Sequence, residues 1–207
     1  MKQYLFNFKC LLVLSCLLYS SSIVRAQQME MHNMVIKNKN IYIAMMDTMM
    51  DKMVHCTNSG FVEDDFITQM IPHHEGAVEM AKYEIQHGRS FEMIQLAKSI
   101  LTEQTSEIEQ MQLWLEKYSP VTRELPQFQQ AMNQTMELMM ENMPGDGMLT
   151  DLDMAFAKVM TPHHQAAIDM AKVVIRFSKD GQTNAFAKHI ISSQQIEIEQ
   201  MKSFTNN

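Results

Sequence analysis

The sequence predicts an all-α protein, a helical bundle built from two tandem three-helix repeats with pseudo-twofold symmetry. Three observations support this prediction. The chain repeats itself at an offset of ninety residues without insertion or deletion, each repeat contains three segments whose apolar residues recur with the helical period, and strand patterns are absent. Neither repeat is expected to bury its apolar faces alone, so the two should pack together.

The repeat is clearest in one doubled motif. MIPHHEGAVEMAK occupies residues 70–82 and MTPHHQAAIDMAK occupies residues 160–172. The same register continues downstream, where Gln104 and Glu107 correspond to Gln194 and Glu197. The repeats therefore span residues 41–114 and 131–204, within a single helical domain of residues 41–207.

The first helix of each repeat carries a stripe of methionines on one face. The stripes run over residues 45–53 and 132–143 and account for many of the 23 methionines in the chain. Methionine is a good helix former that fills irregular gaps in a core, so we expect most of these side chains to be core residues and a minority to be weak thioether ligands.

The second helix of the first repeat should begin after Ser59 or Asp64 as a cap. Its apolar period continues through Pro72, which predicts one helix that lacks a single backbone hydrogen bond at the carbonyl of Thr68. Turn signals at Gly88 and at Asp180-Gly181 should close the second helices. The third helices are expected over residues 91–117 and 183–204, and residues 120–126 should join the repeats.

Residues 1–26 have the features of a cleaved secretory signal: Lys2 and Lys9, a short apolar run, and small residues near Ala26. A lipoprotein acylated at Cys16 is less favoured, because the apolar run continues past that cysteine. Residues 27–40 form a polar, methionine-rich tail that we expect to be disordered. No later segment is long and apolar enough to span a membrane, so the mature chain should be periplasmic or secreted.

The charge and the cysteine count argue against a nucleic-acid-binding protein and against a fold stabilised by disulfides. The formal charge is −7, and removal of a basic signal segment makes the rest more acidic, which disfavours a nucleic-acid partner. After loss of Cys10 and Cys16, Cys56 is the only thiol, so no intrachain disulfide is available. No catalytic triad or phosphate-binding glycine loop is visible, and we do not expect an enzyme.

The doubled motif combines soft and borderline metal ligands. In a helix Met70 is adjacent to His73 and His74, and a third helix folded back on the second brings Gln104, at the level of His74, and Glu107 to the same place. Thioether and imidazole together favour Cu(I), with Ag(I) as its mimic, and Gln or Glu would orient the imidazoles. The expected ligands are Met70, His73, His74, Met80 and Met111, with Met160, His163, His164, Met170 and Met201 in the second repeat.

Other interpretations remain open. In one, the methionines are core, one histidine of each pair hydrogen-bonds Glu107 in a buried network, and the other histidine is at the surface. A carboxylate di-iron site is disfavoured, because Glu84 and His87 have Val174 and Phe177 as counterparts. His55-Cys56 is more readily an idle pair than a ligand pair, and His189 looks like ordinary helix surface. In the tail, Met29, Met31, His32 and Met34 could capture copper or be inert.

At these residues the sequence resembles a bacterial family known as the domain of unknown function 305 (DUF305) family. The shared pattern is Met-x-x-His-His-x-x-Ala-x-x-Met-Ala followed by Gln-x-x-Glu-Ile-x-x-Met, and both halves match it, from Met70 and from Met160. The resemblance covers most of the mature chain. It implies an exported, ferritin-like bundle, and the CopM-like members imply copper binding and resistance.

We therefore expect an exported protein that sequesters or transfers Cu(I), with metal ions and a copper donor or acceptor protein as partners. One alternative is a non-enzymatic interaction module of the cell envelope, whose methionine-lined faces bind a partner helix. The other is ferroxidase-like metal oxidation.

Overall fold

The computed structural model describes residues 39–206. The predicted signal segment, Cys16 and the candidate tail ligands Met29, Met31, His32 and Met34 lie outside the described residues. Within residues 39–206 the chain forms α-helices, one short 3-10 helix and no strand, which confirms the all-α prediction. The helices are α2 (Ile41–Val54), α3 (Val62–His87), α4 (Phe91–Lys117), α5 (Pro126–Glu141), the 3-10 helix η1 (Asp146–Met148), α6 (Leu152–Phe177) and α7 (Gly181–Thr205).

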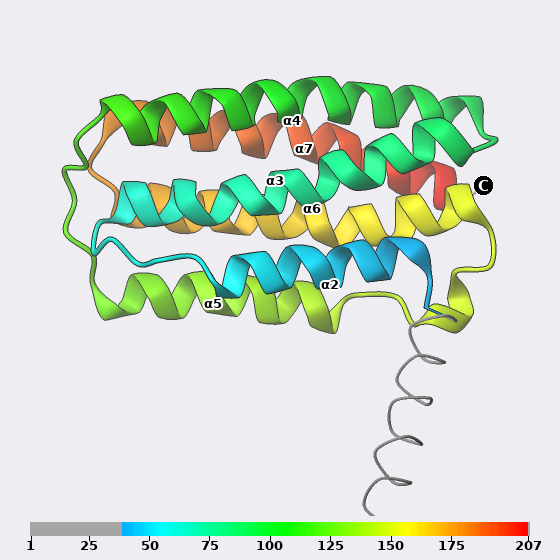
Figure 1. Cartoon of the computed structure of the whole chain (residues 1–207), viewed down its shortest axis with the longest axis horizontal. Helices are drawn as coiled ribbons and strands as arrows, with labels where there is room; N and C mark the ends of the chain where they lie inside the picture. Colours follow the sequence, from blue (N-terminus) through cyan, green and yellow to red (C-terminus); the bar gives the residue numbers. More distant parts are fainter. Residues whose placement is uncertain (1–38, 207) are drawn as a thin grey trace, which may run out of the picture. The chain divides into compact units, whose positions relative to one another are not determined.

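The two repeats are α2–α3–α4 and α5–α6–α7. In each, the second helix packs along both the first and the third, and α3 also packs against α6 of the other repeat. Figure 1 shows α3 and α6 in the middle, with α4 and α7 on one side and α2 and α5 on the other. The two helices that carry the His-His motifs are therefore in contact at the centre of the bundle.

Both motif helices pass through their prolines without interruption, as the apolar period predicts. Pro72 lies inside α3 and Pro162 inside α6. Because a proline has no N–H, the carbonyl of Thr68 has no donor in its own helix. The thiol of Cys56 donates to that carbonyl, with 3.4 Å between Sγ and the oxygen.

The helix ends differ in part from the predictions. Residue Phe61 stands at the N-cap of α3 without a side-chain cap, so the prediction of Ser59 or Asp64 was wrong. Gly88 closes α3, with its N–H donating to the Glu84 carbonyl. Asp180, by contrast, caps the start of α7 through the N–H of Thr183, because an aspartate accepts readily from the first turn of a helix.

The methionine stripes form part of one continuous core. In α2 the buried members are Met46, Met49 and Met53, and in α5 they are Met132, Met136 and Met139. Met140 is 42% exposed and is the exception. The expectation that these stripes are mostly core is therefore confirmed.

A buried acidic side chain at the start of each motif helix ties the two repeats together. Asp153 of α6 accepts from the N–H groups of Arg89 and Ser90, at 2.9 and 2.8 Å. Glu63 of α3 accepts from Ser178 Oγ at 2.6 Å and from the N–H of Thr122 at 3.0 Å. Asp153 thus satisfies the turn that ends α3, and Glu63 satisfies Ser178 at the end of α6 together with Thr122 in the segment between the repeats.

A further buried pair belongs to the first repeat alone. The hydroxyl of Tyr42 in α2 donates to Glu84 Oε2 in α3 at 2.5 Å, and both residues are fully buried. The pKa of Glu84 is raised to about 7. Burial is the largest cause and the nearby carboxylate of Asp153 raises the pKa as well, whereas the hydrogen bond from Tyr42 lowers it. The counterparts Met132 and Val174 are apolar, so this pair fixes α2 in a way that α5 lacks.

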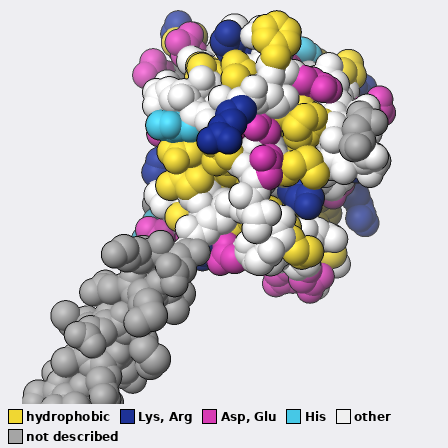
Figure 2. Space-filling view, turned by 90° about the vertical axis from the view of Figure 1, so that its right-hand side faces the viewer, with side chains coloured by type: hydrophobic (Ala, Val, Ile, Leu, Met, Phe, Trp, Pro, Cys, Tyr) yellow, Lys and Arg dark blue, Asp and Glu magenta, His cyan; other side chains and the backbone are white. Residues whose placement is uncertain are grey.

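None of the helices in the described part of the chain is long and apolar enough to cross a membrane. Figure 2 shows one end of the bundle, where acidic, basic and hydrophobic side chains are interspersed over the surface.

Candidate metal centre

The four motif histidines meet where α3 and α6 cross the centre of the bundle. The side chains of His73, His74, His163 and His164 are all fully buried. The rings of His73 and His163 stack with centroids 3.9 Å apart and planes inclined by 34°. His74 lies 6.2 Å from His73, and His164 lies 5.8 Å from His163, between ring centroids. The two motifs thus form one cluster of four imidazoles.

The outer histidine of each pair is held by a glutamate. His74 Nε2 lies 2.9 Å from Glu107 Oε2, and His164 Nε2 lies 2.8 Å from Glu197 Oε2. When the imidazole is neutral, donation from Nε2–H fixes the tautomer and leaves the lone pair on Nδ1. A carboxylate that orients an imidazole in this way is the usual support of a histidine ligand.

The sequence predicted that His74 would be level with Gln104, yet its hydrogen-bond partner is Glu107, almost one turn further along α4. Long side chains on a helix lean toward its N-terminus, so the Glu107 side chain covers the turn before its own Cα. The predicted alignment of His74 with Gln104 along the helices is compatible with this contact, because the Glu107 side chain reaches back by about one turn to His74.

The inner histidines are held differently. His163 Nε2 donates to the backbone carbonyl of His73 at 3.1 Å, which leaves the lone pair of a neutral ring on Nδ1. Neither nitrogen of His73 has a hydrogen-bond partner. Burial lowers the pKa of His73 and of His163 well below the usual value, and neighbouring imidazoles lower it further. Both rings are therefore neutral near pH 7.

The cluster contains many buried polar atoms without a hydrogen-bond partner. Among these atoms are both nitrogens of His73 and Nδ1 of His74, His163 and His164. The side-chain amides of Gln104 and Gln194, on the helices that face the motifs, also have no partner. A folded protein tolerates few such groups, because each costs free energy when it is taken out of water. Their concentration in one place makes this cluster the candidate ligand site among the described residues.

The six methionines that the sequence analysis assigned to the site are also fully buried. They lie in the hydrophobic core, on the same four helices as the histidines and glutamates. The motif helices carry Met70, Met80, Met160 and Met170, and the third helices carry Met111 and Met201.

The weaker candidate ligands lie outside the histidine cluster. His55 is exposed and its Nδ1 lies 2.6 Å from the carbonyl of Asp51, while Cys56 bonds the Thr68 carbonyl. His87 is exposed and stacks on Tyr83, and Glu84 is occupied by Tyr42. These contacts give the side chains of Cys56 and Glu84 structural roles away from the centre.

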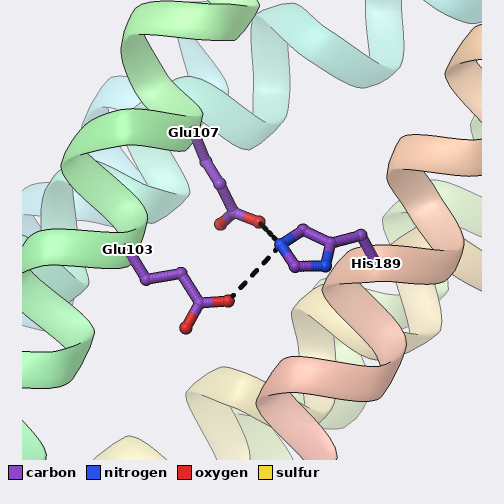
Figure 3. Close-up of side chains that lie close together, drawn as sticks. All are labelled: Glu103, Glu107 and His189. Carbon is purple, nitrogen blue, oxygen red and sulfur yellow. Dashed lines mark ion pairs between the residues drawn. The ribbon is translucent and has the colours of Figure 1, made fainter.

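One cluster of side chains was not predicted from the sequence. His189 of α7 is exposed, as expected, but it faces Glu103 and Glu107 of α4 (Figure 3). The two glutamates are four residues apart on one helix face, which is a signal for a paired carboxylate site. Recognising His189 as their partner requires the packing of α4 beside α7, which the sequence does not give.

Solved structures of similar proteins share this fold. CopM in its Cu(I)-bound form is 30% identical, with a TM-score of 0.54, over 70% of this chain and 96% of that one. CopM in an Ag-bound form is 29% identical, with a TM-score of 0.53, over 70% and 95%. A DUF305 protein from Streptomyces coelicolor, described as secreted, is 22% identical, with a TM-score of 0.56, over 71% of this chain and 92% of that one. At this identity the likeness shows the fold alone.

Among curated proteins, none matches the sequence. The model of the family described as "Domain of unknown function (DUF305)" matches residues 19–115 and again residues 63–205. The second match contains both His-His motifs and the four helices that surround them. The chain therefore belongs to the DUF305 family.

Proposed function

We propose that this protein binds Cu(I), with Ag(I) as a mimic, and sequesters the ion or transfers it in copper homeostasis or resistance. The observation that carries the proposal is the stacked pair of His73 and His163, whose buried ring nitrogens include three without a hydrogen-bond partner. The proposed ligands are drawn from the four motif histidines and the six buried methionines.

The donor types favour a soft ion. Imidazole nitrogen binds many transition metals, but thioether sulfur binds hard ions poorly and selects Cu(I) among the physiological metals. A buried site that contains the neutral imidazoles of His73 and His163 also suits a singly charged ion better than a doubly charged one, because less charge is transferred out of water. The carboxylates of Glu107 and Glu197 would orient the imidazoles of His74 and His164 from behind.

The protonation of the inner histidines supports the same proposal. A histidine must be neutral to bind a metal, and metal affinity otherwise falls as protons compete. Because burial keeps His73 and His163 neutral, their lone pairs require no deprotonation near pH 7. The likeness to CopM in its Cu(I)- and Ag-bound forms supports the choice of ion.

We propose a binding protein rather than an enzyme. The methionine-lined faces that an interaction module would offer to a partner helix lie mostly in the core, which weighs against that alternative. Transfer of the ion would require an exported protein and a copper donor or acceptor, both of which remain part of the proposal.

The test is anaerobic titration with Cu(I) in competition with a chromogenic chelator. His73→Phe keeps an aromatic ring against His163 and removes both unpartnered nitrogens, so it should lower the affinity by about tenfold or more. His163→Phe should do the same. His55→Ser is the matched control, because His55 is exposed and lies outside the cluster.

Circular dichroism would verify that each variant keeps its helical content. If a folded His73→Phe, His163→Phe double variant holds Cu(I) as tightly as the unaltered protein, the histidine cluster does not bind the ion and the proposal fails.

A further inference from the structure

A second cluster of metal-ligand types lies between α4 and α7, outside the four-histidine centre and joined to it through Glu107. Its members are Glu103 and Glu107 of α4 and His189 of α7, whose side chains point toward one another in Figure 3. One ligand atom from each lies within 4.8 Å of the others. His189 is exposed, Glu103 is partly exposed and Glu107 is buried, so the cluster runs from the surface inward.

The distances in the cluster fit ligands that share an ion better than hydrogen bonds. His189 Nε2 lies 3.6 Å from Glu103 Oε1 and 3.8 Å from Glu107 Oε1. Both separations are longer than a normal hydrogen bond. Two ligands bound at about 2.0–2.1 Å to one tetrahedral ion are about 3.4 Å apart, which is close to the observed spacing.

The state of Glu107 is an independent indication of a ligand. This side chain is only 4% exposed, and its Oε2 accepts from His74 while its Oε1 has no hydrogen-bond partner. A buried carboxylate oxygen normally has a hydrogen-bonding or metal partner. This unpartnered oxygen is the one that faces His189 Nε2 (Figure 3).

From this geometry we propose that Glu103, Glu107 and His189 bind a divalent cation of the borderline class, Zn²⁺ or Cu²⁺. One imidazole and two carboxylates, with a position open to water, form a ligand set common for such ions, and no thioether is needed. The site differs from the proposed Cu(I) centre in location and ligands, and it does not depend on that centre binding copper.

Glu107 would belong to both sites. Its Oε2 orients His74 and its Oε1 would hold the outer cation, so one carboxylate bridges the surface cluster and the buried cluster. The second repeat has no equivalent outer site, because the positions of His189 and Glu103 correspond to Ser99 and Ser193. The protein should therefore bind one outer cation and not two.

Zinc is the appropriate probe, because thioethers bind it poorly and a doubly charged ion is disfavoured in the buried histidine cluster. Calorimetric titration of the purified protein with Zn²⁺ should give one equivalent that is lost in His189→Ser and at least tenfold weaker in Glu103→Gln, since even removal of a supporting residue costs about 10- to 100-fold in metal affinity. His55→Ser, another exposed histidine beside a carboxylate, should bind zinc unchanged. Crystals soaked in zinc should show an anomalous difference peak between Glu103 and His189.

The outcomes separate this proposal from the proposed function. Retention of the zinc equivalent by His189→Ser, or its loss in His73→Phe but not in His189→Ser, would overturn the outer site. Loss of Cu(I) affinity in His73→Phe with zinc binding unchanged is the expected pattern. If His73→Phe alters neither ion while His189→Ser abolishes zinc binding, the outer site stands and the Cu(I) proposal fails.

Discussion

His73 and His163 occupy the same position in the two repeats, and their rings stack with centroids 3.9 Å apart at the contact of α3 with α6. Equivalent side chains of the two repeats therefore meet at this contact. In addition, the Nε2 of His163 bonds the His73 carbonyl, whereas neither nitrogen of His73 has a partner. The centre is thus asymmetric in its hydrogen bonds although its residues are duplicated.

We expect His73→Phe to raise the stability of the metal-free protein. His73 makes no side-chain hydrogen bond, so phenylalanine loses no partner and removes two buried polar atoms that cost about 1–3 kcal/mol each when unsatisfied. The stacking on His163 is retained. Chemical denaturation of the metal-free variant should show a gain of roughly 1–2 kcal/mol, less any cost of the larger ring.

His74→Phe is the matched comparison, one position along the same helix and equally buried. It removes the hydrogen bond to Glu107 and leaves Glu107 Oε2 without a partner, and a hydrogen bond to a charged group contributes about 1.5–3 kcal/mol. The variant should therefore be less stable than the unaltered protein. Equal losses for His73→Phe and His74→Phe would show that His73 contributes to the core as an ordinary packed residue.

The sequence predicts the contacts of this centre that lie within one repeat, but not those between helices of different repeats. The repeat and the helical period predict the helices, the burial of the methionine stripes and the presence of Glu107 and Glu197 beside the histidines. They do not predict that His73 and His163 stack, because that contact depends on the crossing of α3 and α6 from different repeats. The sequence gives neighbours within a helix and between adjacent helices, and the pairing of distant helices depends on three-dimensional packing.

Cys56→Ala should destabilise the protein by about 0.5–1.5 kcal/mol. The thiol donates to the carbonyl of Thr68, which Pro72 leaves without a donor in its own helix, so alanine removes a partner that the helix cannot replace. Cys56→Ser should restore most of the loss, because a hydroxyl donates to the same carbonyl. Thermal unfolding of both variants tests this role, and a Cys56→Ala protein as stable as the serine variant contradicts it.

Metal binding provides a second readout for Cys56. Its thiol lies outside the histidine cluster, and burial, together with the carboxylate of Glu75, raises its pKa, so the thiolate needed for metal binding is disfavoured. The affinity for Cu(I) should be the same in Cys56→Ser and in the unaltered protein. A loss in this variant would restore the His55-Cys56 ligand pair as a candidate.

Glu84 should make the stability of the fold depend on pH. Its pKa in the folded protein is raised by burial to about 7, above its value in the unfolded chain, so the folded state binds the proton more tightly. The contribution of Glu84 is fully present below the unfolded pKa of about 4.3 and is lost as pH rises to about 7. Glu84→Gln, which cannot ionise, should flatten the decline of unfolding free energy between about pH 4.3 and about pH 7.

Tyr42→Phe separates the hydrogen bond from the ionisation. It removes the donor to Glu84 Oε2 and so raises the pKa of Glu84 further, because the Tyr42 hydrogen bond opposes the effect of burial. The variant should be less stable, and its decline should begin at the same unfolded pKa but extend to higher pH than in the unaltered protein. An unchanged pH profile in both variants would mean that Glu84 stays ionised or is solvated in the folded protein.

Because the two repeats match, a second outer cation site can be introduced by substitution around Glu197. Glu197 matches Glu107 in burial, in its hydrogen bond to a motif histidine and in having an unpartnered Oε1. Only the partners are missing, since Ser99 and Ser193 stand where His189 and Glu103 stand on the other side. Ser99→His combined with Ser193→Glu should raise the zinc stoichiometry from one to two, measured by calorimetry. Adding Glu197→Gln should return it to one, whereas a stoichiometry of one in the folded double variant would show that these three side chains are insufficient to bind the ion.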